Sequence, residues 1–403
     1  LQHAQTVGET AAAAPRYAGA YRAGVIGHTG HGGYGHGLDV AVVGLPGVAV
    51  VAVADPDEAG GRKAAAQAGA GRAYADYRQM LEQEALDLVL VAPSDLDQHE
   101  AMVVAAAQAG ARAIYCEKPL ARALDEADRM LAACDARGVK LAVAHQNRAF
   151  PAPRLAQRLI AAGRIGRLRL VRSWPKQDDR GGGLDLLVHG THLFDLMRLF
   201  AGDARWCHAR VTCAGEREGQ NEGRDARPAD VHEGRYASGP VAGDGIVATY
   251  GFDAGATGIV ESMQSDDGGG SEYLRWEVGG TGGTLAFWSR LDSPVYFCPR
   301  PYPLPDCPAE WQRFQPEGVP LQAGRSGLHP ANQTLVRDLL AAVEENRAPT
   351  ASGHDARAAL EMVLAAYESH ITGGRVALPL QARTHPLTRW LTEARPKEHE
   401  GSE

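Results

Sequence analysis

The chain has 403 residues, 44% of them hydrophobic and 22% charged, which is typical of a folded protein with two domains. The formal net charge of −8 argues against nucleic-acid binding, because no excess of basic residues can neutralise phosphates. No apolar run is long enough to span a membrane, and the six cysteines show neither C-x-x-C spacing nor a small disulfide framework. We therefore expect a cytoplasmic protein with reduced thiols and no membrane partner.

The first part of the chain alternates between short apolar runs and stretches of helical periodicity. Residues 1–20 are rich in Ala, Thr and Gly and lack a signal-peptide pattern, so a flexible tail is expected there. The expected strands are 22–27, 48–54, 86–91, 113–116 and 140–144, and the expected helices are 35–43, 57–68, 77–84, 97–109 and 124–137. This alternation predicts a parallel sheet with right-handed crossovers, a doubly wound Rossmann domain over 21–150.

The pattern changes after Pro151 and Pro153. The apolar runs that follow are joined by Gly-rich turns, and we expect strands at 168–173, 204–213, 246–252, 258–263, 274–278, 284–288 and 295–298. Two helices are expected at 332–346 and 355–371. Successive strands with few helices predict an α+β domain over 151–385, built on one large, open, predominantly antiparallel sheet. Residues 386–403 are expected to form a C-terminal tail.

The turn after the first strand, G-H-T-G-H-G-G-Y-G-H over 27–36, is rich in glycine. Glycine lets a backbone approach a pyrophosphate closely, and the helix that follows supplies N–H donors. A Gly-rich turn alone also fits an ordinary strand-to-helix connection, but here it follows a strand and precedes a second strand that ends in an acid. The spacing is G-x-x-G-x-x-G, so the loop is longer than usual. The cofactor contacts expected here are Gly27, His28, Thr29, Gly30, Gly33 and Tyr34.

Asp55 ends the second strand. A carboxylate there accepts hydrogen bonds from the adenosine ribose hydroxyls and repels a 2′-phosphate. No Arg or Lys follows immediately to neutralise such a phosphate. The sequence therefore favours NAD over NADP as the cofactor.

Two further groups of residues carry the chemistry. Glu117 and Lys118 follow another strand at the sheet edge that binds ligands, where Lys118 could lower the pKa of a reacting hydroxyl and Glu117 could accept from the nicotinamide ribose. An isolated Lys at a strand end would be read as a solvated surface charge.

His189, His192 and Asp195 recur every three residues, so they share one face of a helix. A histidine there can take a hydroxyl proton as hydride leaves carbon, and Asp195 could orient His192. Two alternatives stay open. The H-x-x-H pair could ligate a metal, although no third or fourth ligand is visible and none is predicted; the histidines could also be hydrogen-bonded core residues.

In their order along the chain, these motifs resemble the Gfo/Idh/MocA family of glucose-fructose oxidoreductase and inositol dehydrogenase. The matching stretches are A-G-V-I-G at Ala23, V-A-V-A-D at Val51, V-L-V-A-P-S with His99 downstream, E-K-P at Glu117, H-Q-N-R at His145, G-R-I-G-R-L at Gly163, G-G-G…H-L-F-D, and E-S-H-I-T-G-G-R at Glu368.

The resemblance implies an NAD-binding Rossmann domain and homodimers or homotetramers packed through the C-terminal sheet. It implies that Lys118 is the lysine of the E-K-P motif and His192 the catalytic acid/base, with further cofactor contacts at Pro93, Ser94 and His99. The substrate contacts expected are Arg148, Trp174, Asp178, Asp179, His189, His192 and Asp195.

One position departs from the family. Its D-x-x-x-H-x-x-D pattern would have an aspartate four residues before His192, where this chain has Val188. An apolar side chain cannot orient the lysine or bind a substrate hydroxyl. We predict that the neighbouring His189 takes over this role as a third catalytic residue.

These features predict an NAD-dependent oxidoreductase that acts on a secondary hydroxyl of a sugar, glycoside or cyclitol. Two alternatives remain from the sequence. One is a glycoside hydrolase or lyase that retains its NAD and oxidises the sugar transiently, and the other is a non-catalytic NAD-binding regulator on the same fold.

Overall fold

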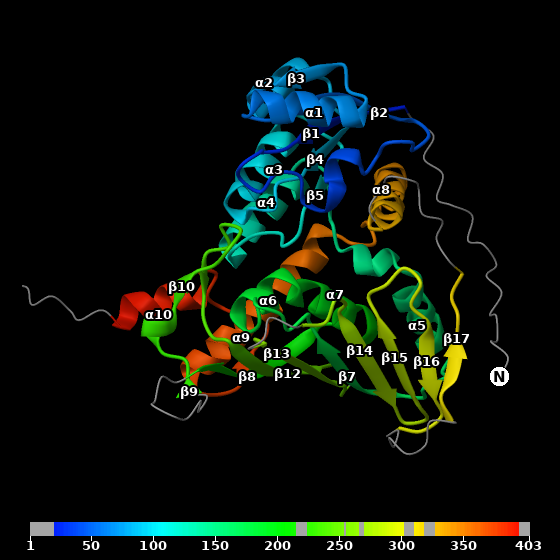
Figure 1. The fold of residues 1–403 in the computed structure, drawn as a ribbon, viewed down its shortest axis with the longest axis vertical. Coiled ribbons are helices and arrows are strands. Elements are labelled where there is room, and N and C mark those ends of the chain that lie inside the picture. Colours follow the sequence, from blue (N-terminus) through cyan, green and yellow to red (C-terminus); the bar gives the residue numbers. More distant parts are fainter. Residues whose placement is uncertain are drawn as a thin grey trace, which may run out of the picture.

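The structure, a computed structural model, describes residues 20–214, 224–253, 255–265, 270–301, 310–317 and 327–394. A smaller sheet with its helices stands above a larger sheet, and a layer of helices lies between the two (Figure 1). Apart from Ala20, the expected N-terminal tail falls outside the described residues.

The first sheet has six parallel strands in the order β3-β2-β1-β4-β5-β6, the order of dinucleotide-binding domains. Its strands are β1 (Tyr21–Ile26), β2 (Val48–Ala54), β3 (Arg72–Tyr74), β4 (Leu88–Val91), β5 (Ala113–Cys116) and β6 (Lys140–Val143). The helices between them are η1 (Gly35–Val40), α1 (Glu58–Ala68), α2 (Tyr77–Gln83), η2 (Leu96–Gln98), α3 (His99–Gln108) and α4 (Leu124–Asp135). The predicted doubly wound domain is confirmed, since β4 and β5 are buried along their whole length as a sheet covered on both faces requires.

Two details of this domain differ from the prediction. The strand β3 was not expected, because it has three residues and is partly polar. The expected helix 35–43 is a distorted 3₁₀ segment, because His36 and Gly37 adopt positive φ angles of 49° and 73° that break the helical path.

The second sheet has ten strands, and its predicted large, open, mostly antiparallel character is confirmed. Nine run in the order β17-β16-β15-β14-β7-β13-β12-β8-β18, β9 pairs with β8, and only β7 and β13 lie parallel. The strands are β7 (Leu168–Trp174), β8 (Ala204–Cys213), β9 (Arg224–Asp225), β12 (Gly245–Phe252), β13 (Thr257–Met263), β14 (Arg275–Gly280), β15 (Thr284–Trp288), β16 (Val295–Cys298), β17 (Gln312–Phe314) and β18 (Val376–Ala377). A separate hairpin joins β10 (His232–Glu233) to β11 (Pro240–Val241), after the short η4 (Pro228–Asp230).

Helices cover one face of this sheet, the face turned toward the Rossmann domain (Figure 1). They are α5 (Pro151–Ala161), α6 (Gly183–Val188), α7 (Gly190–Ala201) and α9 (Gly353–Thr372). Along β12 and β13, Ile246 and Val260 are buried under this layer, whereas Val247 and Met263 on the other face are 41% and 40% exposed. No described helix covers that other face.

The end of the chain departs from the predicted boundaries. Helix α8 (His329–Glu344) packs against β5 and β6 of the Rossmann domain rather than on the second sheet, and its Asn332 accepts a hydrogen bond of 2.8 Å from Tyr115. The unit expected over 151–385 is therefore interrupted. Residues 386–394, expected to be part of a tail, form α10 (Pro386–Ala394), because Pro386 and Leu387 are buried against the body of the protein.

A buried ion pair joins the two domains. Arg148 lies in η3 (Gln146–Ala149), directly after the last Rossmann strand, and donates from Nε and Nη2 to Asp195 on α7 at 2.7 and 2.8 Å. Burial disfavours a charge on Asp195, but Arg148 and His145 outweigh it and hold the pKa of this carboxyl well below its ordinary value. Arg148 also reaches Asp355 at the start of α9, so three elements meet at one guanidinium.

We expect Arg148→Met to destabilise the chain by about 3–5 kcal/mol, because it leaves the fully buried Asp195 without its partner. The midpoint of urea unfolding measures the loss. Since the pKa of Asp195 is lowered on folding, the pair stabilises fully above about pH 4 and its contribution disappears as the pH falls below that value.

A matched control is Arg205→Met, which removes one partner of the fully exposed Arg205–Asp253 pair and should leave the midpoint unchanged. Equal effects of the two substitutions would contradict the assignment of the Arg148 pair as the main polar link between the domains.

Candidate active site

The Gly-rich loop after β1 lies close to the turn that follows β4. Gly32 has a φ of 80°, and a Cβ on it would stand 2.7 Å from the backbone nitrogen of Ser94 and 2.5 Å from that of Asp95. Ser94 in turn donates its backbone N–H to the Gly32 carbonyl at 3.0 Å. Glycine at this position therefore serves the close approach of two backbones at the carboxyl edge of the sheet.

Asp55, the acid predicted to bind ribose, is fully buried under this loop. It accepts hydrogen bonds from the Thr29 hydroxyl at 2.7 Å and from the Tyr34 hydroxyl at 2.8 Å, as well as from the backbone N–H of Thr29 and Asp57. Thr29 and Tyr34 were expected to contact the cofactor, and here they bind the acid itself. A ribose can reach Asp55 only by displacing one of these hydroxyls.

A cavity of about 400 Å³ opens beside Asp55. Its walls include Gly27, Ala54 and Pro56 from the ends of β1 and β2, with Tyr77 and Met102 opposite. This is the position at which doubly wound sheets bind nucleotides, and the apolar walls suit a purine ring. Neither Tyr77 nor Met102 was expected here from the sequence, because they come from two different helices.

His28 and His31 fasten the loop to the segment after β4. Nδ1 of His28 lies 2.5 Å from Gln98, and the His31 ring lies 3.0 Å from both Asp95 and Asp97. The backbone at Gly30 and Gly33, in contrast, is open, since a Cβ at either position would meet no atom within 4 Å.

Glu117 is fully buried at the end of β5. Burial raises the pKa of its carboxyl. The ring of His36, 2.5 Å from Oε1, and the neighbouring Lys118 have a larger opposite effect, so the pKa is lowered overall and the group stays ionised. Its other oxygen, Oε2, is buried and has no hydrogen-bond partner among the residues that the structure describes. A ribose hydroxyl can donate to a buried carboxylate oxygen that lacks a partner, so the residues present fit a nicotinamide dinucleotide.

Lys118 is 4% exposed and donates from Nζ to the main-chain carbonyl of Val188 at 3.2 Å. Burial lowers the pKa of its ammonium group, and Arg180 and Lys176 add to this effect while Glu117 opposes it. The prediction about Val188 concerned its side chain, whereas the hydrogen bond to Lys118 is accepted by its main-chain carbonyl.

His189 stands between α6 and α7, and its Nδ1 lies 2.5 Å from Asp185, one helical turn earlier. Burial lowers the pKa of His189 to about 4, against the opposing effect of Asp185. Asp185 is itself held by the Ser262 hydroxyl and by the backbone N–H of Gln177, each at 3.0 Å. The sequence reasoning missed Asp185, although its spacing of four residues before His189 on a helix was a usable signal.

His192 lies on α7 and is 8% exposed. Burial holds the pKa of its imidazole well below the ordinary value, and Lys118, His145, His36 and His189 lower it further. A neutral imidazole beside a buried lysine can accept a proton from a hydroxyl group.

Three residues that were expected to contact the substrate or the cofactor bind other parts of the protein. Asp195 pairs with Arg148 and lies 3.2 Å from His145, so its carboxylate is engaged by these two residues, and a contact of Asp195 or Arg148 with substrate stays a prediction. The ring of His99 lies 2.8 Å from the Pro93 carbonyl and 3.1 Å from the Pro119 carbonyl. His99 therefore links two turns of the site, and its contact with a cofactor stays a prediction.

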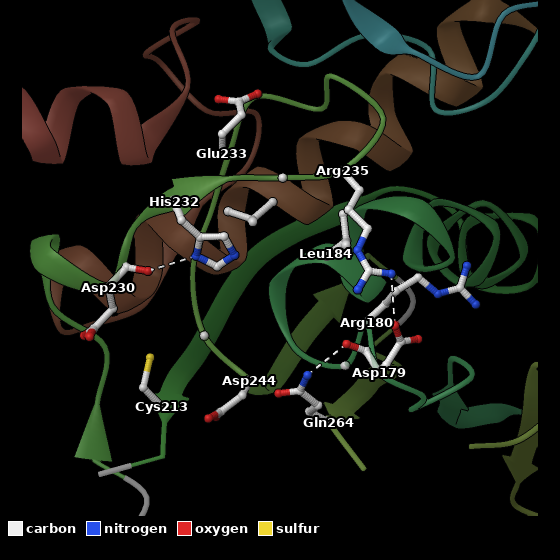
Figure 2. A pocket seen from close by; sticks show the side chains of 14 residues that line it. Asp179, Arg180, Leu184, Cys213, Asp230, His232, Glu233, Arg235, Asp244 and Gln264 are labelled. Atoms are coloured by element: carbon white, nitrogen blue, oxygen red, sulfur yellow. Dashed lines mark hydrogen bonds and ion pairs between the residues drawn. The ribbon is translucent and has the colours of Figure 1, made fainter. Parts of the chain in front are cut away.

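The remaining expected substrate residues lie in two separate places. Asp179 borders a cavity of about 490 Å³ next to α6, where Arg235 reaches it at 2.9 Å (Figure 2). Asp178 is bound by Arg180, whose hydrogen bond lowers the pKa of that carboxyl to about 2. Trp174 lines a different cavity of about 330 Å³, where the guanidinium of Arg275 stacks 3.9 Å from its ring centre.

Among the described residues, no three His, Cys, Asp or Glu side chains are grouped so that they could hold a metal ion. Within the same residues, no helix combines the length and the apolar character needed to cross a membrane.

Several known proteins are similar to this chain in sequence. The curated relatives include levoglucosan dehydrogenase of Pseudarthrobacter phenanthrenivorans, 32% identical over 60% of this chain and 65% of that protein. D-apiose dehydrogenase of Paraburkholderia graminis is 35% identical over 40% of this chain and 44% of its own length. Inositol 2-dehydrogenase 1 of Saccharopolyspora erythraea is 37% identical over 36% and 42%. The matched part thus spans less than two thirds of each relative.

Solved structures share the fold over most of the chain. An oxidoreductase domain protein from Kribbella flavida aligns with a TM-score of 0.69 and 26% identity, over 89% of this chain and 99% of that one. Levoglucosan dehydrogenase in complex with NADH and levoglucosan aligns with a TM-score of 0.67 and 24% identity, over 89% and 100%.

The sequence matches the models of two domains of one protein family. Residues 21–145 match the NAD-binding Rossmann fold of an oxidoreductase family, and residues 159–378 match the C-terminal α/β domain of the same family. The chain belongs to the Gfo/Idh/MocA family of oxidoreductases.

Proposed function

We propose that this chain is an NAD-dependent oxidoreductase acting on a secondary hydroxyl of a sugar, glycoside or cyclitol. The observation that supports it best is the meeting of Lys118 with His189 and His192 at the carboxyl edge of the Rossmann sheet. All three side chains are buried, and the pKa of each is lowered. The relatives that act on levoglucosan, D-apiose and inositol support the same class of substrate.

The chain's own residues divide the work. Lys118, oriented by the Val188 carbonyl, donates to the reacting hydroxyl and stabilises the negative charge that develops on its oxygen. His192 takes the hydroxyl proton, and His189, fixed by Asp185, binds the substrate beside it. Bound NAD supplies the hydride acceptor. It would be held by Gly27, Gly30, Gly33, Asp55 and Glu117.

The face of the second sheet that is turned away from the Rossmann domain supports a proposal about assembly. Val247 and Met263 are exposed there, and no described helix covers that face (Figure 1). We propose that it packs against a second copy of the chain in a homodimer or homotetramer. The described cysteines are free and mostly buried, which supports a cytoplasmic location.

The direct test mixes the purified protein with NAD and levoglucosan, D-apiose or myo-inositol and follows the absorption band of reduced nicotinamide. We expect net reduction with at least one of them. Lys118→Met and His192→Gln should each lower turnover by about 10²–10⁴-fold, because each removes a group that acts on the reacting proton.

The exposed substitution Arg205→Met serves as the control and should keep full activity. Cleavage of a glycoside without net reduction would instead show an enzyme that retains its cofactor. If the protein binds NAD but shows neither reaction with a broad panel of polyols, it is instead a non-catalytic regulator.

The role of His189 can be tested separately. His189→Ala should lower kcat by about 10²-fold with little change in the Kd of NAD, because the imidazole acts on the substrate and not on the cofactor. Asp185→Asn should reproduce part of the loss, since it weakens the bond that fixes the ring. Wild-type turnover of His189→Ala would remove His189 from the mechanism.

Cofactor choice depends on Asp55. Calorimetry should show that the protein binds NAD at least about 10-fold more tightly than NADP, because a buried carboxylate repels a 2′-phosphate. Asp55→Ala should narrow this ratio by weakening NAD binding. Asp253→Asn, on the exposed partner of Arg205, should leave the ratio unchanged, and equal affinities in the wild type would contradict the assignment.

A further inference from the structure

Two buried imidazoles face each other across the domain boundary. His145 follows β6 of the Rossmann domain and is 1% exposed, and its ring centre lies 5.4 Å from that of His192 on α7, with the planes tilted by 59°. Among the described residues, Nε2 of His145 and Nδ1 of His192 are buried without a hydrogen-bond partner, and Nδ1 of His145 lies 3.2 Å from Asp195 without the geometry of a hydrogen bond. Each such atom costs about 1–3 kcal/mol, which packing alone does not explain.

The far side of His145 meets a fixed negative charge. Its Nδ1 lies 3.2 Å from Oδ1 of Asp195, and the two bonds from Arg148 hold that carboxylate in place. Asp195 therefore cannot turn toward His192, although it follows His192 by three residues on the same helix. The groups stand in the order Asp195, His145, His192.

This order determines which nitrogen carries each proton. If Nδ1–H of His145 points to Asp195, Nε2 of His145 keeps a lone pair that can accept from Nδ1–H of His192. Rings 5.4 Å apart can align these nitrogens by a rotation about χ2. Nε2 of His192 is then left with the lone pair that a base needs.

We propose that His145 is a positioning residue that fixes the tautomer of His192 and takes over its Nδ1 proton during the reaction. The proposal rests on the oxidoreductase function given above. As the substrate O–H bond breaks, its proton joins Nε2 of His192, and the Nδ1 proton of His192 passes to Nε2 of His145. The carbon that carries this hydroxyl would lose its hydride to bound NAD, and the reverse reaction would return both protons.

The charges around the two rings favour this direction of transfer. His192 is faced by Lys118, His36 and His189 as well as by His145, so a positive charge on it is opposed from several sides. His145 instead lies against the Asp195 carboxylate, with Arg148 on the other side of that carboxylate. An imidazolium is therefore better placed on His145 than on His192.

The first test needs no substrate. The protein is labelled at the Cε1 carbons of histidine, and the His192 signal is followed by NMR against pH in the wild type and in His145→Gln. We expect His192 to take up its proton at a lower pH in the variant, because the Nδ1 proton of a protonated His192 can no longer pass to Nε2 of His145. His385→Gln is the matched control, since His385 is a buried histidine remote from the site and should leave the His192 titration unchanged.

The second test uses whichever sugar or polyol the wild type oxidises. His145→Gln should lower kcat by about 10²-fold and shift its pH profile, with KM nearly unchanged, because glutamine can bond to His192 but cannot accept its proton. A His192 titration that is unshifted or shifted to higher pH in the folded variant would overturn the proposal, and so would wild-type kcat.

The two tests separate the possible failures. If no substrate is oxidised by the wild type, the function proposed above fails, and the titration alone still decides whether His145 and His192 are coupled. Should His145→Gln fail to fold, His145→Asn is measured in the same two ways.

Discussion

The geometry of the site depends on one buried ion pair. Arg148 leaves the Rossmann domain directly after its last strand and binds Asp195 through two parallel hydrogen bonds. That pair sets the position of α7, which carries His192, and of the turn before it, which carries His189. Lys118 then meets the Val188 carbonyl from the other domain. Removing this pair would loosen the position of α7 relative to the Rossmann domain, which carries Lys118.

Burial gives these groups their chemistry. Burial lowers the pKa of Lys118, His189 and His192, and the charge of Lys118 lowers the pKa of the two histidines further. The neighbouring carboxylates are fixed by bonds of their own: Glu117 by His36, and Asp185 by Ser262. A site of this kind keeps its histidines neutral near pH 7, which is what proton acceptance from a hydroxyl requires.

The nucleotide side of the site follows a different principle. The Gly-rich loop is drawn onto Asp55 by Thr29 and Tyr34 and is tied to the next turn by His28. The loop with the irregular glycine spacing thus supplies the hydrogen-bond donors for Asp55 itself. The cavity beside it is complete only because Tyr77 and Met102 arrive from two further helices.

The sequence by itself determined the elements and the motifs, since apolar periodicity and strand-end residues are local properties. It predicted both sheets, and it singled out Asp55, Lys118, His189 and His192, which the structure places at the carboxyl edge of the Rossmann sheet or beside it. Only the tertiary structure decided the partners of these residues. A spacing of three residues puts His192 and Asp195 on one helix face, but it cannot show that Arg148 and His145, about fifty positions earlier, claim the carboxylate. Likewise, an apolar stripe on α8 does not say which of two sheets it will cover, because that choice depends on packing between distant segments.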